Sequence, residues 1–170
     1  MLYRRVLAAL AFLACTPLAG EAQSVTESLA GLYDVTKTNI MATAELADAE
    51  LLAYRPTDEV RSTAELLGHI ANAQFAFCSA AAGESSPQTE NYEETRTTRD
   101  GLIEALQAGF QYCDGVFDAM TDEDGARAVT FIGPSTAHGV LAFNSAHNYE
   151  HYGNLVTYMR MNGIVPPSSR

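Results

Sequence analysis

The sequence predicts an all-α protein, a four-helix bundle with a long crossover between its second and third helices. Four stretches of about twenty residues carry apolar side chains at helical spacing. Ser-x-x-Glu capping boxes, glycines and prolines mark the ends of these stretches. Histidines on the apolar faces of the second and fourth stretches place polar groups inside the bundle, which is where such folds build their sites.

The first predicted helix spans residues 25–47, with one further turn reaching residue 53. Ser24 and Glu27 form a capping box at its start, and the Arg55-Pro56 pair prevents the helix from continuing. Ser62 begins the second helix with another capping box, and Gly83 ends it because glycine readily adopts the left-handed conformation. Residues 84–99 are polar and predict a loop that crosses between helices.

The third predicted helix runs over residues 98–120. Residues 129–132 are β-branched or aromatic, a composition that favours a short extended segment before Gly133. Ser135 or Thr136 can cap the fourth helix, whose apolar stripe includes Phe143. Gly163 ends this helix, and the two prolines that follow prevent a restart.

The first 22 residues are typical of a secretory signal peptide. Two arginines precede an apolar run over residues 6–14 that is too short to span a bilayer, and small residues follow it. We expect cleavage after Ala22, or alternatively after Ala19, and a mature domain over residues 23–170. Cys15 raises the alternative of a lipoprotein, but the leucine expected three residues earlier is missing. The predicted location is therefore exported, either periplasmic or secreted.

The net charge of −11, from 21 acidic and 10 basic residues, restricts the partners. Such a chain repels phosphate backbones and anionic membrane surfaces, which excludes nucleic acid and, once the signal is removed, membranes. We expect a small-molecule substrate or ligand, and the sequence leaves a homodimer open.

Three histidines are the candidate ligands of one divalent metal ion. His147 and His151 lie four positions apart, so they share one helix face. His69 lies in an apolar helical run and is the expected third ligand. Zinc, nickel, iron and manganese all accept such donors. The alternative for each histidine is a hydrogen-bonded core residue, and His138 is expected at the surface or helix start, away from the metal.

Five further side chains are candidates for supporting roles. Glu150 is the nearest carboxylate in sequence and could act as a base or orient a ligand, although a solvated helix face explains it equally well. Asn72 and Asn144 lie one turn from the histidines and could face the ligand, against simple helix polarity. Tyr152 and Tyr158 could line the pocket, against ordinary core packing.

Cys78 and Cys113 remain once the signal peptide is removed. An even number of cysteines in an exported chain predicts a disulfide between them. The alternative, a cysteine ligand to the metal, is disfavoured for Cys78 because nine helical residues separate it from His69.

Four segments resemble the DinB-like family of metal-binding four-helix bundles, which includes thiol S-transferases that use bacillithiol or mycothiol. They are YRPT at residues 54–57, ELLGHIA at 65–71, HNYEHYG at 147–153 and GIVPP at 163–167. In that family, one histidine of the second helix and two of the fourth hold a divalent metal. The resemblance implies this role for His69, His147 and His151. The predicted export signal departs from the family pattern. Low-molecular-weight thiols act mostly in the cytosol, so export argues against thiol transfer as the reaction.

Three functions follow as hypotheses. The first is a metal-dependent enzyme of the hydrolase or thiol S-transferase type, with open coordination positions on the ion. The second is a non-catalytic exported protein that binds a metal or a small ligand. The third is a helical interaction domain whose histidines are merely buried.

Overall fold

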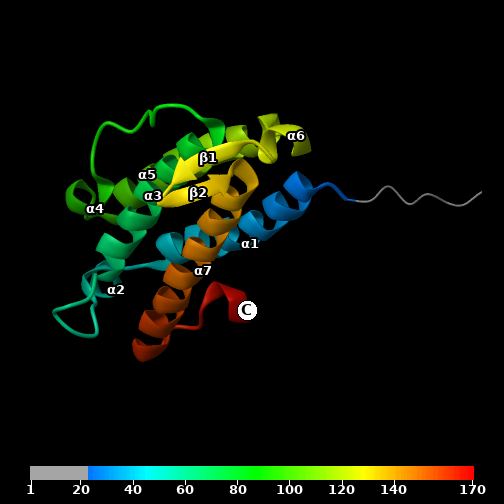
Figure 1. Cartoon of the computed structure of the whole chain (residues 1–170). Coiled ribbons are helices and arrows are strands. Elements are labelled where there is room, and N and C mark those ends of the chain that lie inside the picture. The colour runs from blue at the N-terminus through cyan, green and yellow to red at the C-terminus, as the bar shows by residue number, and fades with distance from the viewer. Residues whose placement is uncertain (1–22) are drawn as a thin grey trace, which may run out of the picture.

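The computed structural model describes residues 23–170, so the predicted signal peptide at residues 1–22 lies outside the described residues. Four long helices form the bundle (Figure 1): α1 (Val25–Leu46), α3 (Thr63–Ala82), α5 (Arg99–Ala119) and α7 (Ala137–Met161). The all-α prediction and the long crossover between the second and third helices of the bundle are confirmed. No helix within residues 23–170 has the length and apolar character that crossing a membrane requires.

Five short elements lie between the long helices and a sixth follows the last of them, and several differ from the sequence prediction. They are α2 (Ala49–Ala53), α4 (Tyr92–Thr95), α6 (Asp122–Gly125), β1 (Ala128–Phe131), β2 (Gly133–Thr136) and a 3₁₀ turn at Pro167–Ser169. The expected extension of the first helix is a separate helix, because the Asp48 side chain accepts a hydrogen bond from the Leu51 amide and caps a new start. The crossover, expected to be a loop, contains α4.

The core lies where α3 packs against α5 and α7, with α1 closing the bundle against the same two helices. Its largest fully buried side chains come from all four helices and include Tyr33, Ile70, Leu106 and Leu155. Several polar groups inside this core are hydrogen-bonded to one another, which avoids the cost of burying them unpaired. Gln74 of α3, fully buried, donates to Asn148 of α7 over 2.8 Å.

The extended piece expected at residues 129–132 is one strand of a β-hairpin, whose second strand the sequence analysis missed. β1 and β2 pair antiparallel, with Phe131 opposite Gly133. Ile132 forms the turn at a φ of 55°, a left-handed conformation that β-branched residues rarely adopt. In Figure 1 the hairpin lies across α3 and α7, and the Phe131 ring packs 4.8 Å from that of Phe77.

Candidate metal site

The packing of α3 against α7 brings the three predicted histidines together. His69 projects from α3, and His147 and His151 project from successive turns of α7. The Nε2 atom of His147 lies 3.1 Å from Nε2 of His69 and 3.0 Å from Nε2 of His151. One nitrogen from each ring lies within 4.8 Å of the other two, so the three nitrogens could coordinate one metal ion.

All three imidazoles are neutral near pH 7. Burial, followed by the neighbouring rings of His151 and His69, lowers the pKa of His147 to about 4. Burial, followed by His69 and Arg61, likewise lowers the pKa of His151 to about 4. The pKa of His69 is lowered mainly by burial, which outweighs the opposing effect of Glu93. A neutral ring offers a lone pair, which is the form that binds metal.

A metal ion fits this convergence. The buried Nδ1 atoms of His147 and His151 have no hydrogen-bond partner among the described residues. Nitrogens bound at about 2.0–2.1 Å to one ion lie about 2.9–3.4 Å apart, for bond angles near 90–109°. The two short Nε2 separations match this range. The donor set of three imidazoles suits zinc and other borderline divalent ions.

Glu93 is a site residue that the sequence analysis missed. Its Oε2 lies 3.1 Å from Nδ1 of His69, and its Oε1 accepts a 2.7 Å hydrogen bond from Arg61. A carboxylate at Nδ1 makes that nitrogen the N–H donor and leaves Nε2 as a bare lone pair aimed at the cluster. Glu93 lies on α4, a single turn within the polar crossover, so no helical periodicity marked it.

Glu93 to Ala is expected to weaken metal binding by about 10- to 100-fold, because His69 loses the acceptor that fixes its tautomer and orientation. Glu93 to Gln keeps an acceptor oxygen and is expected to fall between this variant and the wild type. The matched control is Glu94 to Ala, since Glu94 is exposed on the same turn. Zinc affinity measured by competition with a chromophoric chelator gives the comparison. Equal affinities for Glu93 to Ala and Glu94 to Ala would contradict the role.

Gly68 allows α4 to approach α3, and its replacement is expected to destabilise the protein. A Cβ at Gly68 would lie 2.7 Å from the Glu93 Cα and from the Tyr92 carbonyl oxygen, both backbone atoms that cannot swing aside. Gly68 to Ala should therefore lower the free energy of unfolding by about 1–3 kcal/mol. Gly31 to Ala, on an exposed face with no atom within 4 Å, should instead raise it by about 0.5–1 kcal/mol. Urea unfolding of both variants checks the opposite signs.

Two of the three histidines, His69 and His147, open onto a cavity of about 590 Å³, here called the histidine cavity. Its lining includes His69, His147, Asn72, Ala76, Phe77 and Glu93. Asn72, a predicted pocket residue, does line it, and its Oδ1 accepts a 2.9 Å hydrogen bond from the Tyr92 amide, which holds the crossover in place. Glu150 is exposed and makes no hydrogen bond among the described residues, so the carboxylate in contact with the cluster is Glu93 instead.

The other three predicted pocket residues point elsewhere. Asn144 is fully buried and donates a 3.0 Å hydrogen bond to Gln74 in the core. The hydroxyl of Tyr152 accepts from the Ser168 amide and so holds the C-terminal segment. The hydroxyl of Tyr158 donates to the backbone carbonyl oxygen of Arg61. Because the Arg61 side chain bonds Glu93, Tyr158 is connected to the site only through Arg61.

His138 lies at the start of α7, outside the histidine cluster, as predicted, but it is not a surface residue. Its side chain is only 14% exposed, because it packs between α1 and α6. Its Nε2 lies 2.8 Å from the Thr26 hydroxyl, and Thr26 in turn donates to Asp122. These contacts tie the start of α1 to α6 and give His138 a structural role.

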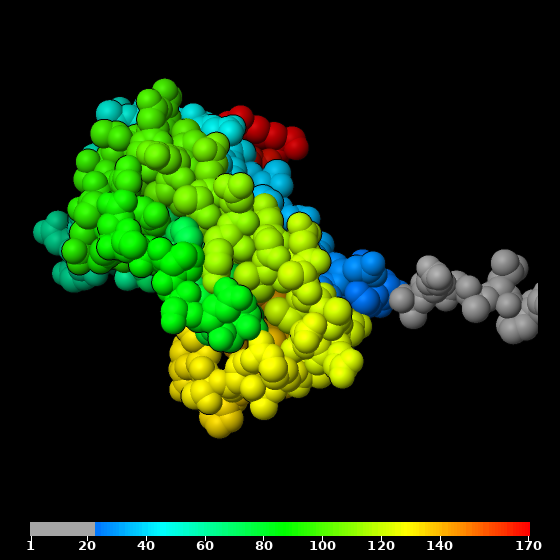
Figure 2. Space-filling model, turned by 90° about the horizontal axis from the view of Figure 1, so that it is seen from above, coloured from blue at the N-terminus to red at the C-terminus, as the bar shows by residue number. Residues whose placement is uncertain are grey.

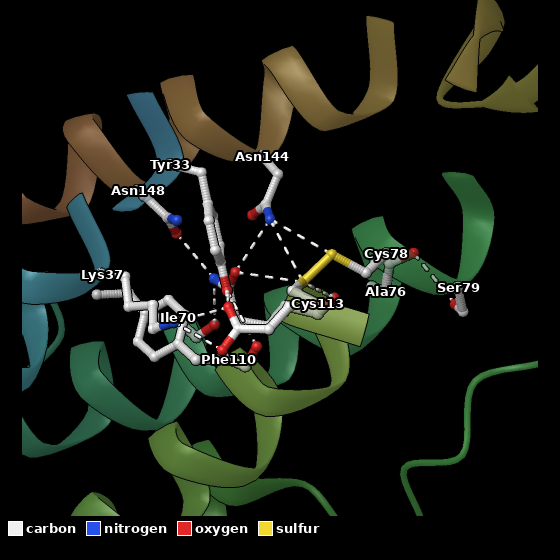
Figure 3. Close-up of a disulfide and its surroundings, with 12 residues drawn as sticks. Tyr33, Lys37, Ile70, Ala76, Cys78, Ser79, Phe110, Cys113, Asn144 and Asn148 are labelled. Atoms are coloured by element: carbon white, nitrogen blue, oxygen red, sulfur yellow. Dashed lines mark hydrogen bonds and ion pairs between the residues drawn. A yellow bond between two sulfur atoms is a disulfide. The ribbon is translucent and has the colours of Figure 1, made fainter. Parts of the chain in front are cut away.

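Cys78 of α3 and Cys113 of α5 form the predicted disulfide, and both are fully buried. Figure 3 shows the Asn144 amide facing the two sulfur atoms, each 3.7 Å from its nitrogen. A cysteine in a disulfide offers no thiolate, so the alternative of a cysteine metal ligand does not apply to this state.

A family model places the chain among known proteins: the model of the DinB superfamily matches residues 32–155. The chain belongs to the DinB superfamily. This DinB protein has similar folds among solved structures. A DinB-like protein from Bacillus cereus has a TM-score of 0.72 and 17% identity, covering 83% of this chain and 95% of that one. A DinB-like protein from Bacillus subtilis has a TM-score of 0.65 and 21% identity, covering 80% and 92%.

A third similar structure is a mycothiol-dependent maleylpyruvate isomerase. Its TM-score is 0.63 and its identity 17%, over 79% of this chain and 63% of that one. At these identities the likenesses establish a common fold. None of the curated proteins is similar enough in sequence to match the chain.

Proposed function

We propose that this DinB protein binds one divalent metal ion through His69, His147 and His151 and uses it as an enzyme acting on a small molecule. The observation that carries the proposal is the convergence of three neutral imidazole nitrogens, two of whose rings, His69 and His147, line an open cavity. The group of metal-ligating atoms found among residues 23–170 holds these three histidines alone, which leaves coordination positions for a ligand.

The proposed reaction is hydrolytic or a thiol S-transfer. An ion held by neutral imidazoles acts as a Lewis acid that activates a water or thiol or polarises a carbonyl. The chain supplies the rest: Glu93 holds the proton of His69 at Nδ1, and the Phe77 ring, 5.2 Å from that of His147, excludes water from one side of the cluster. The fold shared with a mycothiol-dependent isomerase supports thiol chemistry, and the predicted export supports hydrolysis.

The second candidate is a non-catalytic protein that binds a metal or small ligand, and one observation favours it. The two carboxylates that line the histidine cavity are both engaged already. Glu93 bonds Arg61 and His69, and Glu90 accepts from Arg96 and from Thr95. Neither is free to take a proton from a substrate without giving up an existing partner.

Turnover distinguishes the two candidates. Zinc-, nickel-, iron- and manganese-loaded protein is assayed against panels of esters, amides and thiol acceptors, with His147 to Ala as the metal-free control. We expect activity in at least one panel that is lost in the control. Rates equal to those of the control in every panel would favour the binding protein.

We also propose that residues 1–22 direct export and are removed. The buried Cys78–Cys113 disulfide supports this, because such bonds persist in oxidising compartments. N-terminal sequencing of the protein from a bacterial host should begin at Gln23 or, with the earlier cleavage, at Gly20. An intact Met1 on cytosolic protein would contradict export.

A further inference from the structure

We propose that the small molecule bound at the histidines is amphipathic, with a polar head at the metal ligands and an alkyl or aryl part lying against the β-hairpin. This inference rests on the proposed function and specifies its ligand. It comes from the contrast between two walls on either side of the histidines, one polar and one apolar.

The polar wall is the crossover between α3 and α5. Gln88, Glu90 and Asn91 line the histidine cavity from this side. The Gln88 amide donates to the Glu90 backbone carbonyl oxygen and to Asn72, and the Asn72 amide donates to Asn91. Because these groups are already hydrogen-bonded, the wall holds its shape without a ligand. The floor next to it is made of the small side chains Ala73 and Ala76, which leave room above α3.

The apolar wall begins at Phe77 and continues to the hairpin. The Phe77 ring lies 5.2 Å from the His147 ring, 5.3 Å from the Phe143 ring and 4.8 Å from the Phe131 ring. Phe131 and Phe143 line a second hollow of about 370 Å³ with Ile132 and Val140, here called the hairpin recess. Phe77 therefore lines the histidine cavity and packs against two aromatic rings that line the hairpin recess.

Two large apolar side chains on this wall are exposed. Phe143 is 46% exposed although it lies one turn before His147 on α7. Ile132 is 85% exposed and adopts the left-handed conformation at the hairpin turn, where glycine or asparagine would be unstrained. Strain that packing does not require is a signature of functional positions. In Figure 2 the hairpin, in yellow, projects from the body beside the green crossover.

A homologous series of hydroxamates tests the inference. Cobalt(II)-loaded full-length mature protein is titrated with acetohydroxamate, hexanohydroxamate and octanohydroxamate, and the visible absorption of cobalt reports binding of the shared head group. The hydroxamate head is the same throughout, so any gain in affinity comes from the added methylenes. Full burial of a methylene should tighten binding about fourfold. Burial of about half its surface against the hairpin should contribute half that free energy, which is about twofold per methylene.

Two variants and a control show where on the protein the gain in affinity for longer chains arises. Phe143 to Ala removes the exposed ring, and Ile132 to Asn relieves the strain of the turn while removing the apolar surface. Each should reduce the preference for octanohydroxamate over acetohydroxamate at least about fivefold. Ile132 to Asn should also raise the unfolding midpoint, which separates a binding role from a structural one. Leu32 to Ala is the control, since Leu32 is 45% exposed on α1 and lines neither hollow.

The outcomes separate this inference from the proposed function. Failure of acetohydroxamate to change the cobalt spectrum would count against the metal site itself, and the inference would fall with it. Binding of all three probes with equal affinity would overturn the inference and leave the metal site standing. Light scattering tests the remaining occupant, a second copy of the chain: a dimer that Phe143 to Ala dissociates, with an unchanged chain-length preference, would also overturn the inference.

Discussion

His147 to Ala is expected to abolish metal binding, the largest effect of any substitution at the site. The Nε2 of His147 lies 3.1 Å from that of His69 and 3.0 Å from that of His151, so its removal takes away the ligand closest to both others and leaves only two ligands for the ion. Wild-type protein purified without chelator should carry about one ion per chain. With free metal at about 100 times its dissociation constant, the wild type should gain about 2.7 kcal/mol of stability that the variant lacks. Elemental analysis and thermal unfolding with added zinc measure the two effects.

The matched control is His138 to Ala, because His138 lies on the same helix and outside the cluster. This variant loses the contact with Thr26 and should unfold more easily, but its metal content should equal that of the wild type. A His147 variant that retained a full ion, or a wild type whose stability did not respond to any of the four metals, would refute the three-histidine site.

The sequence predicted the parts of this fold that local interactions determine. Both capping boxes form as expected, with Ser24 and Ser62 each bonding the backbone three residues later. Gly83 ends α3 at a φ of 78°. These signals depend on a few neighbouring residues, so the caps form independently of the tertiary packing around them. The spacing of His147 and His151 is local in the same sense, because helix geometry alone places them on one face.

The site contacts that the sequence missed depend on tertiary packing. Glu93 reaches His69 only because Gly68 allows the backbone of α4 to lie against α3. The periodicity of apolar residues carries no information about how closely two backbones approach. Gly68, a glycine within a helix and next to the candidate ligand His69, could have indicated such a close approach. For Tyr152 and Tyr158 the sequence left pocket lining and core packing open, and the structure places both in the core. Helical spacing gives the direction of a side chain but not which segment it meets, here the C-terminal segment and the Arg61 turn.

Removal of the Cys78–Cys113 disulfide is expected to cost about 3–4 kcal/mol of stability in the chain-entropy account, for the observed separation of 35 residues. The bond joins α3 to α5, so it closes the crossover that carries Glu93 and constrains the unfolded chain. The double variant Cys78 to Ala and Cys113 to Ala removes it without leaving a free thiol. Urea unfolding with and without reductant measures the loss.

Reductant supplies the internal control for this experiment. The wild type, unfolded and refolded in reductant, should shift to a lower midpoint, while the double variant should be insensitive to reductant because it has no bond to break. Both should bind metal as the oxidised protein does, since the sulfurs contact Asn144 and no atom of the three histidines. A wild-type midpoint that reductant leaves unchanged would show that the bond does not form in the protein. Loss of metal in the double variant alone would instead restore a cysteine to the ligand set.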